Sequence, residues 1–151
     1  MTVDFRFAKA PEMRLATVSW TGPWNERRIQ KEFEGVAAWA AAKKLRVGKW
    51  VFMESPSMKK WTVGIEVKGG TRGDGKVRLR TLPAASVASV TFDPDVVSPR
   101  VVYHGLSDWL RWRRKDKEVK RVVSSRELYS GNPWKDSKAW AHTEVQFVVR
   151  R

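Results

Sequence analysis

The sequence predicts an α+β fold made of duplicated β-α-β-β units related by pseudo-twofold symmetry, with antiparallel sheets, two long helices and a ligand cleft between the halves. Two observations carry this prediction. The order of strand and helix patterns occurs twice, and short motifs match between the halves at offsets of 70 to 77 residues. The length of 151 residues suits one domain. We therefore expect a first unit at 1–70, a glycine-rich linker at 71–76 and a second unit at 77–151.

The first unit is predicted from its apolar periodicity. Residues 21–23 (Thr-Gly-Pro) break the pattern, and a helix follows over 24–44, where apolar side chains recur every three or four residues and alanines are frequent. Alternating or continuous apolar runs predict four strands, at 2–8, 13–20, 48–54 and 59–67. The linker lies in a stretch with four glycines in seven residues and lacks the lysine and hydroxyl ending of a phosphate-binding loop.

The second unit follows the same order. Residues 77–91 are strand-like, with Pro83 interrupting them. A helix is predicted over 98–115, with Pro99 at its first position. Strands are predicted at 121–130 and 138–149.

Matching positions make the repeat explicit. Residues 16–20 match 88–92 at an offset of 72, and helix residues 33–40 match 103–110 at an offset of 70. The helix match pairs Gly35 with Gly105 and Trp39 with Trp109, so we interpret these two tryptophans as core residues. Phe52 and Pro56 match Tyr129 and Pro133 at an offset of 77.

Glu127 is the acidic residue that the repeat does not explain. The offset of 77 relates it to Trp50, and strand alternation places it on the same face as Tyr129. An unpaired acid between apolar neighbours is costly to bury. Two interpretations stay open: an exposed position or a salt bridge to Arg126 or Lys138, and a site carboxylate in an aromatic pocket.

Charge and composition exclude some classes of site. Lys and Arg number 30 against 16 Asp and Glu, which gives a net charge of +14, and seven basic residues fall in Arg111–Arg121. Cys is absent, so disulfides and thiolate–metal sites are excluded. With two histidines, His104 and His142, we expect no metal site and no cofactor. No signal peptide or membrane-spanning stretch is visible, so we expect a soluble cytoplasmic protein with no membrane partner.

Four motifs occur in a characteristic order and spacing, and the match that they define extends over nearly all of the 151 residues. They are residues 20–24 (WTGPW), 35–39 (GVAAW), 125–133 (SRELYSGNP) and 142–149 (HTEVQFVV). Together they resemble the GyrI-like small-molecule-binding domain, also called the AraC or multidrug effector-binding domain. Because residues 1–20 already belong to the first unit, we expect a stand-alone form without a DNA-binding domain in the same chain. Any regulatory protein that works with it would then be a separate partner chain.

The resemblance implies a binder of bulky aromatic or cationic molecules. Its buried glutamate maps to Glu127, with Tyr129 beside it. Ring faces attract cations, and a desolvated carboxylate strengthens the attraction. The candidate ligand-binding residues are therefore Glu127, Tyr129, Trp24, Trp50, Trp61 and Trp140.

Two other functions are weighed beside small-molecule binding. Some stand-alone members of the family hydrolyse reactive cyclopropane-bearing small molecules, and Glu127 would then be the catalytic residue. The other alternative is a nucleic-acid or protein binder that uses Arg111–Arg121, although no DNA-binding or RNA-binding motif accompanies the charge. The sequence also departs from the family at 93–95 (Asp-Pro-Asp), where a Gly-Pro-Tyr turn is expected, and this leaves the shape of one cleft wall open.

Overall fold

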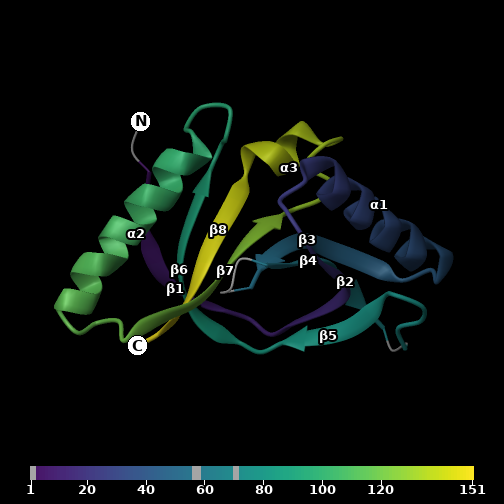
Figure 1. Ribbon diagram of the computed structural model, residues 1–151, viewed down its shortest axis with the longest axis horizontal. Coiled ribbons are helices and arrows are strands. Elements are labelled where there is room, and N and C mark those ends of the chain that lie inside the picture. The colour runs from purple at the N-terminus through teal and green to yellow at the C-terminus, as the bar shows by residue number, and fades with distance from the viewer. Residues whose placement is uncertain (1–2, 56–58, 70–71) are drawn as a thin grey trace.

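A computed structural model describes residues 3–55, 59–69 and 72–151 (Figure 1). Within these residues the elements of the first half are β1 (Arg6–Ala10), β2 (Met13–Thr21), α1 (Glu26–Ala42), β3 (Arg46–Glu54) and β4 (Lys60–Lys68). Those of the second half are β5 (Arg78–Leu82), β6 (Ala85–Phe92), α2 (Pro99–Lys115), β7 (Arg121–Tyr129), α3 (Ser137–Ala141) and β8 (Thr143–Arg150). The predicted α+β class is confirmed. Three residues of the sequence predictions lie outside the described residues: residue 2 of the first predicted strand, residue 56 of a repeat match and residue 71 of the predicted linker.

The eight described strands form one curled antiparallel sheet in the order β1-β6-β8-β7-β3-β4-β2-β5. The strands β1 to β4 of the first half correspond to β5 to β8 of the second. If each strand is exchanged for its equivalent in the other half, the order of the sheet is the same order read from the opposite edge. The pseudo-twofold relation expected from the repeat is therefore visible in the sheet, with the β3–β7 pair at its centre.

The first strand of each half pairs with the other half. β1 pairs with β6, and β5 pairs with β2. Pro83 lies in the short connection between β5 and β6, where the sequence predicts an interruption. This exchange of edge strands ties the two halves together by backbone hydrogen bonds as well as by the central pair.

Both long helices cover the same side of the curled sheet and splay apart, with α3 between them next to α1 (Figure 1). Phe33 and Val36 of α1 are fully buried against the β2–β4 region, and Leu106 of α2 is fully buried in a second cluster with Val90 and Val145. A third, smaller cluster includes Val51 and Leu128. These residues alternate along their strands with members of the first cluster, so they lie on the opposite face of the sheet.

One predicted element is wrong. Residues 138–149 are predicted as a single strand, but the chain forms the short helix α3 before it enters β8. The Asp136 side chain accepts a hydrogen bond from the Lys138 amide at 2.9 Å and starts the helix. The apolar pattern through Trp140 suits either conformation, and the cap at Asp136 decides for the helix.

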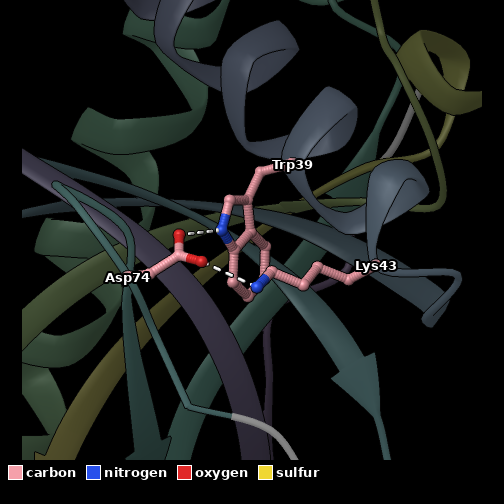
Figure 2. Close-up of polar contacts among 3 residues, drawn as sticks. All are labelled: Trp39, Lys43 and Asp74. Atoms are coloured by element: carbon pink, nitrogen blue, oxygen red, sulfur yellow. Dashed lines mark hydrogen bonds and ion pairs between the residues drawn. The ribbon is translucent and has the colours of Figure 1, made fainter.

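The described part of the linker is held against α1 (Figure 2). The Asp74 carboxylate accepts a hydrogen bond from Trp39 Nε1 at 2.6 Å and pairs with Lys43 Nζ at 2.7 Å. These contacts, with the Lys43 hydrogen bond first, lower the pKa of Asp74. Lys76 also pairs with the buried Glu32 at 3.3 Å. Side chains of the loop thus fix its position, which glycine content alone does not predict.

The two tryptophans expected in the core are half-buried at its edge. Trp39 bonds the linker, and Trp109 packs against Phe5 and Phe7, with Arg113 over its ring at 4.4 Å. Neither side chain is fully enclosed. The repeat therefore identifies equivalent positions and overestimates their burial.

Candidate functional site

The centre of the sheet places four side chains on one face. In the β3–β7 pair, Trp50 lies opposite Tyr129 and Phe52 lies opposite Glu127. Directly opposed residues share a face, as do residues two apart on a strand. Trp50, Phe52 and Tyr129 belong to the core cluster under α1, so Glu127 faces the helices as well.

Glu127 is held by both tyrosines of the chain. Tyr129 Oη donates a hydrogen bond to Glu127 Oε2 at 2.6 Å, and Tyr103 Oη donates one to Oε1. Tyr129 comes from the same strand and Tyr103 from α2, so the carboxylate bridges sheet and helix. Two hydroxyl donors supply the partners that a carboxylate needs when it is removed from water.

Tyr103 is a site residue that the sequence analysis missed. The repeat aligns it with Phe33 and aligns Glu127 with Trp50. In the first half Phe33 stacks on Trp50, with ring centroids 5.1 Å apart and planes inclined by 22°. In the second half the equivalent pair is a phenol and a carboxylate joined by a hydrogen bond. The repeat therefore contained a signal for Tyr103: the aromatic pair Phe33 and Trp50 of the first half is replaced by the polar pair Tyr103 and Glu127 in the second half.

A cavity of about 200 Å³ opens beside this centre. Its walls come from both halves and consist mostly of aromatic side chains. They are Trp24, Glu26, Ile29, Phe33, Phe52, Pro99, Glu127, Tyr129, Trp134 and Trp140. The sequence-predicted residues Glu127, Tyr129, Trp24 and Trp140 therefore come together in one place.

Trp50 and Trp61 do not line this cavity. Trp50 is 7% exposed and stacks on Phe33. Trp61 is 6% exposed, stacks on Phe52 with centroids 6.0 Å apart, and meets Trp24 edge-on. Both residues support the wall residues from behind, and Trp61 Nε1 also donates to the Gly22 carbonyl at 2.9 Å.

The mouth and roof are formed by side chains from loops and from α3. Trp24 is 59% exposed, so its ring is open to an incoming molecule. Trp140 is placed by α3 and by a hydrogen bond of 3.0 Å from its Nε1 to Asp95 Oδ1. Asp95 belongs to the Asp-Pro-Asp segment that departs from the family pattern. That segment therefore anchors a ring of the cavity.

The electrostatics of the cavity oppose those of the chain. The net charge is +14, yet the described residues that line the cavity include two glutamates, Glu26 and Glu127, and no Lys, Arg or His. Burial, and then the negative charge of Glu127, raise the pKa of Tyr103 and of Tyr129 above the ordinary tyrosine value. The pKa of Glu54 is raised by burial and by the charge of Glu127. The cavity is thus aromatic and acidic.

The other candidate features lie elsewhere. Arg111–Arg121 covers the end of α2 and the segment that follows, and contributes no side chain to the aromatic cavity. His142 Nδ1 lies 2.9 Å from the Lys138 carbonyl at the end of α3. Among the described residues, no group of three or more His, Asp or Glu side chains is arranged to hold a metal ion. No helix in the described ranges is long and apolar enough to span a bilayer.

Comparison with known proteins bears on the fold. No family model and no curated protein sequence match the chain. Among solved structures, the C-terminal domain of EcmrR has a TM-score of 0.81 at 17% identity, covering 100% of this chain and 99% of that one. A hydrolase from Listeria innocua has a TM-score of 0.63 at 14% identity, covering 97% and 91%. SAV2435 bound to tetraphenylphosphonium has a TM-score of 0.50 at 15% identity, covering 97% and 94%.

These similarities define the class of fold: a curled antiparallel sheet with two long helices on one side, as in the C-terminal domain of EcmrR. Within that class the chain has the GyrI-like fold, and the resemblance predicted from the four sequence motifs is confirmed at the level of fold.

Proposed function

We propose that the chain binds bulky aromatic cations in the cavity beside Glu127. The observation that carries this proposal is the charge of the lining: two carboxylates and no cation among the described wall residues of a protein with net charge +14. A basic protein repels cations at long range, so an acidic, partly desolvated cavity selects for them only at short range.

The aromatic walls support the same ligand class. Trp24 meets Trp61 and Phe52 edge-on, with ring centroids 5.7 and 5.8 Å away, so the exposed Trp24 ring is held firmly. Tryptophan faces attract cations more strongly than other rings do. A volume of about 200 Å³ accepts a one- or two-ring group, so the remainder of a bulky ligand would lie over Trp24 at the mouth.

Substitution of Glu127 tests this proposal. Tetraphenylphosphonium titrated into the wild-type protein should quench tryptophan fluorescence saturably. Glu127→Gln should weaken binding by at least about tenfold, since it removes the carboxylate and keeps its shape. Glu12→Gln is the matched control: it changes the net charge equally at an exposed position and should leave the affinity within about twofold. Equal weakening by both variants, or no binding by the wild type, would contradict the proposal.

Hydrolysis of a reactive small molecule is the second candidate, and the same variant separates it from binding. The observation in its favour is a carboxylate flanked by two phenols in an aromatic cavity, within a fold that a Listeria hydrolase shares. A hydrolase would keep ligand affinity in Glu127→Gln and lose turnover, because the carboxylate would activate water. Loss of affinity without any product in the wild-type reaction supports binding alone.

A further inference from the structure

We propose a second binding site, for a small oxyanion such as a carboxylate or phosphate, on the face of the sheet opposite the aromatic cavity and centred on Arg126. The site is independent of the function proposed above, because no residue lines both cavities.

Strand alternation separates the two sites. Arg126 immediately precedes Glu127 on β7, so the two side chains project from opposite faces of the sheet. Arg126 pairs across the strands with Met53, which packs against the cluster that contains Val51 and Leu128. The guanidinium is therefore on the far side from the helices and from the aromatic walls.

The Arg126 side chain is buried, and its hydrogen bonds are incomplete. The residue is 6% exposed. Its Nε donates to Gln146 Oε1 at 2.7 Å, and Gln146 Nε2 in turn donates to Glu144 Oε2 at 2.7 Å. Its Nη2 is buried and has no hydrogen-bond partner. A buried cationic donor without an acceptor costs considerable free energy, and burial lowers the pKa of Arg126 accordingly.

A cavity of about 250 Å³ on this face is lined by Arg126 and by further polar and basic residues. Two further cations, Lys60 and Arg80, line it, together with the hydroxyl-bearing residues Thr62 and Ser124. One carboxylate, Glu54, also lines it, so the described charged side chains total three positive and one negative. Burial, and then the charge of Glu127, raise the pKa of Glu54.

The chemistry of this lining matches a small oxyanion. A guanidinium offers parallel N–H donors that fit two oxygens of a carboxylate or phosphate, and such charge-assisted hydrogen bonds are roughly twice as strong as neutral ones. Hydroxyl side chains add adjustable donors. An oxyanion here would supply the acceptor that Arg126 Nη2 lacks in the described structure.

Calorimetric titration with pyrophosphate and, separately, with citrate tests the site at constant ionic strength. We expect one saturable site per chain for at least one of the two anions, and the comparison shows whether phosphate or carboxylate is preferred. Arg126→Met should weaken that binding by at least about tenfold. Arg121→Met removes the same charge from an exposed position on the same strand and should change the affinity less than about threefold.

Two further measurements keep the outcome decisive. If Arg126→Met does not fold, Arg80→Met replaces it, because Arg80 is exposed and its loss should also weaken the anion at least about threefold. Tetraphenylphosphonium binding should be the same in Arg126→Met and wild type, so failure of one site is distinguishable from failure of the other. Absence of saturable binding, or equal weakening in Arg126→Met and Arg121→Met, would overturn the proposal.

Discussion

At the scale of single residues, the site depends on how one carboxylate is held. Glu127 accepts hydrogen bonds from Tyr103 and Tyr129, and these are the two tyrosines of the chain. Nine tryptophans but only two tyrosines occur in the sequence, and both phenols are placed at one carboxylate. The polar part of the cavity is therefore small and well defined, and it can be observed without background from other tyrosines.

The ionisation of these tyrosines gives a direct prediction. Burial and the charge of Glu127 raise the pKa of Tyr103 and Tyr129 in the folded state. In the unfolded chain, tyrosine has its ordinary pKa of about 10. The folded protein should therefore show little phenolate absorbance at about pH 10.5, where the urea-unfolded protein shows most of it.

The raised pKa of the two tyrosines also determines how the free energy of unfolding changes with pH. Above about pH 10 the unfolded chain loses protons that the folded chain keeps, so the free energy of unfolding should fall as pH rises. The contribution is fully present below that pH. The fall should be smaller in Tyr103→Phe, which removes one of the two groups. Phenolate absorbance at the same pH in the folded and unfolded protein would contradict the hydrogen-bonded geometry.

At the residue scale the sequence predicts some of the site and misses the rest for identifiable reasons. Glu127 and Tyr129 are found because they share a strand, where spacing fixes the face. Tyr103 is missed because it approaches from α2, and spacing within a strand says nothing about a helix that packs on it. Trp50 is a candidate that proves to be a support, since alternation fixes its face but not its depth beneath Phe33.

At the scale of elements, the repeat predicts the two halves and misses the exchange between them. Strand patterns at 2–8 and 77–91 identify β1 and β5 approximately, and Pro83 marks the end of β5. Pairing of β1 with β6 and of β5 with β2 is a long-range choice that alternation cannot specify. The helix α3 is missed for the opposite reason: a local cap at Asp136 outweighs a plausible strand pattern.

The aligned glycines of the two helices provide a test of this exchange. An added Cβ at Gly35 meets nothing within 4 Å, whereas one at Gly105 would lie 2.9 Å from Phe5 Cζ, in the segment that leads into β1. Gly35→Ala should stabilise the protein by about 0.5–1 kcal/mol, because alanine favours the helix. Gly105→Ala should gain less or lose stability.

Urea unfolding of both variants measures the difference. The two glycines occupy equivalent places in the repeat, so each serves as the control for the other. If Gly105→Ala gained as much stability as Gly35→Ala, Phe5 would not pack on α2 as described.

At the scale of the whole molecule, the two cavities differ in the charge of their lining residues. The cavity beneath the helices is lined by Glu26 and Glu127, while the cavity on the other face is lined by Arg126, Arg80 and Lys60 and by one carboxylate, Glu54. The sequence alone predicts a basic protein and places its densest cluster at Arg111–Arg121. It does not predict the two cavities, because their lining residues come from segments that lie far apart in the sequence.

The measurement that tests the central claim most directly compares two ligands that differ in charge and little in shape. N-methylquinolinium and 1-methylnaphthalene have nearly the same size, and both suit a cavity of about 200 Å³. Titration calorimetry with each should show the cation binding at least about tenfold more tightly to the wild-type protein, because Glu127 and the tryptophan faces favour positive charge. Equal affinity for the two ligands, or preference for the neutral one, would contradict the account.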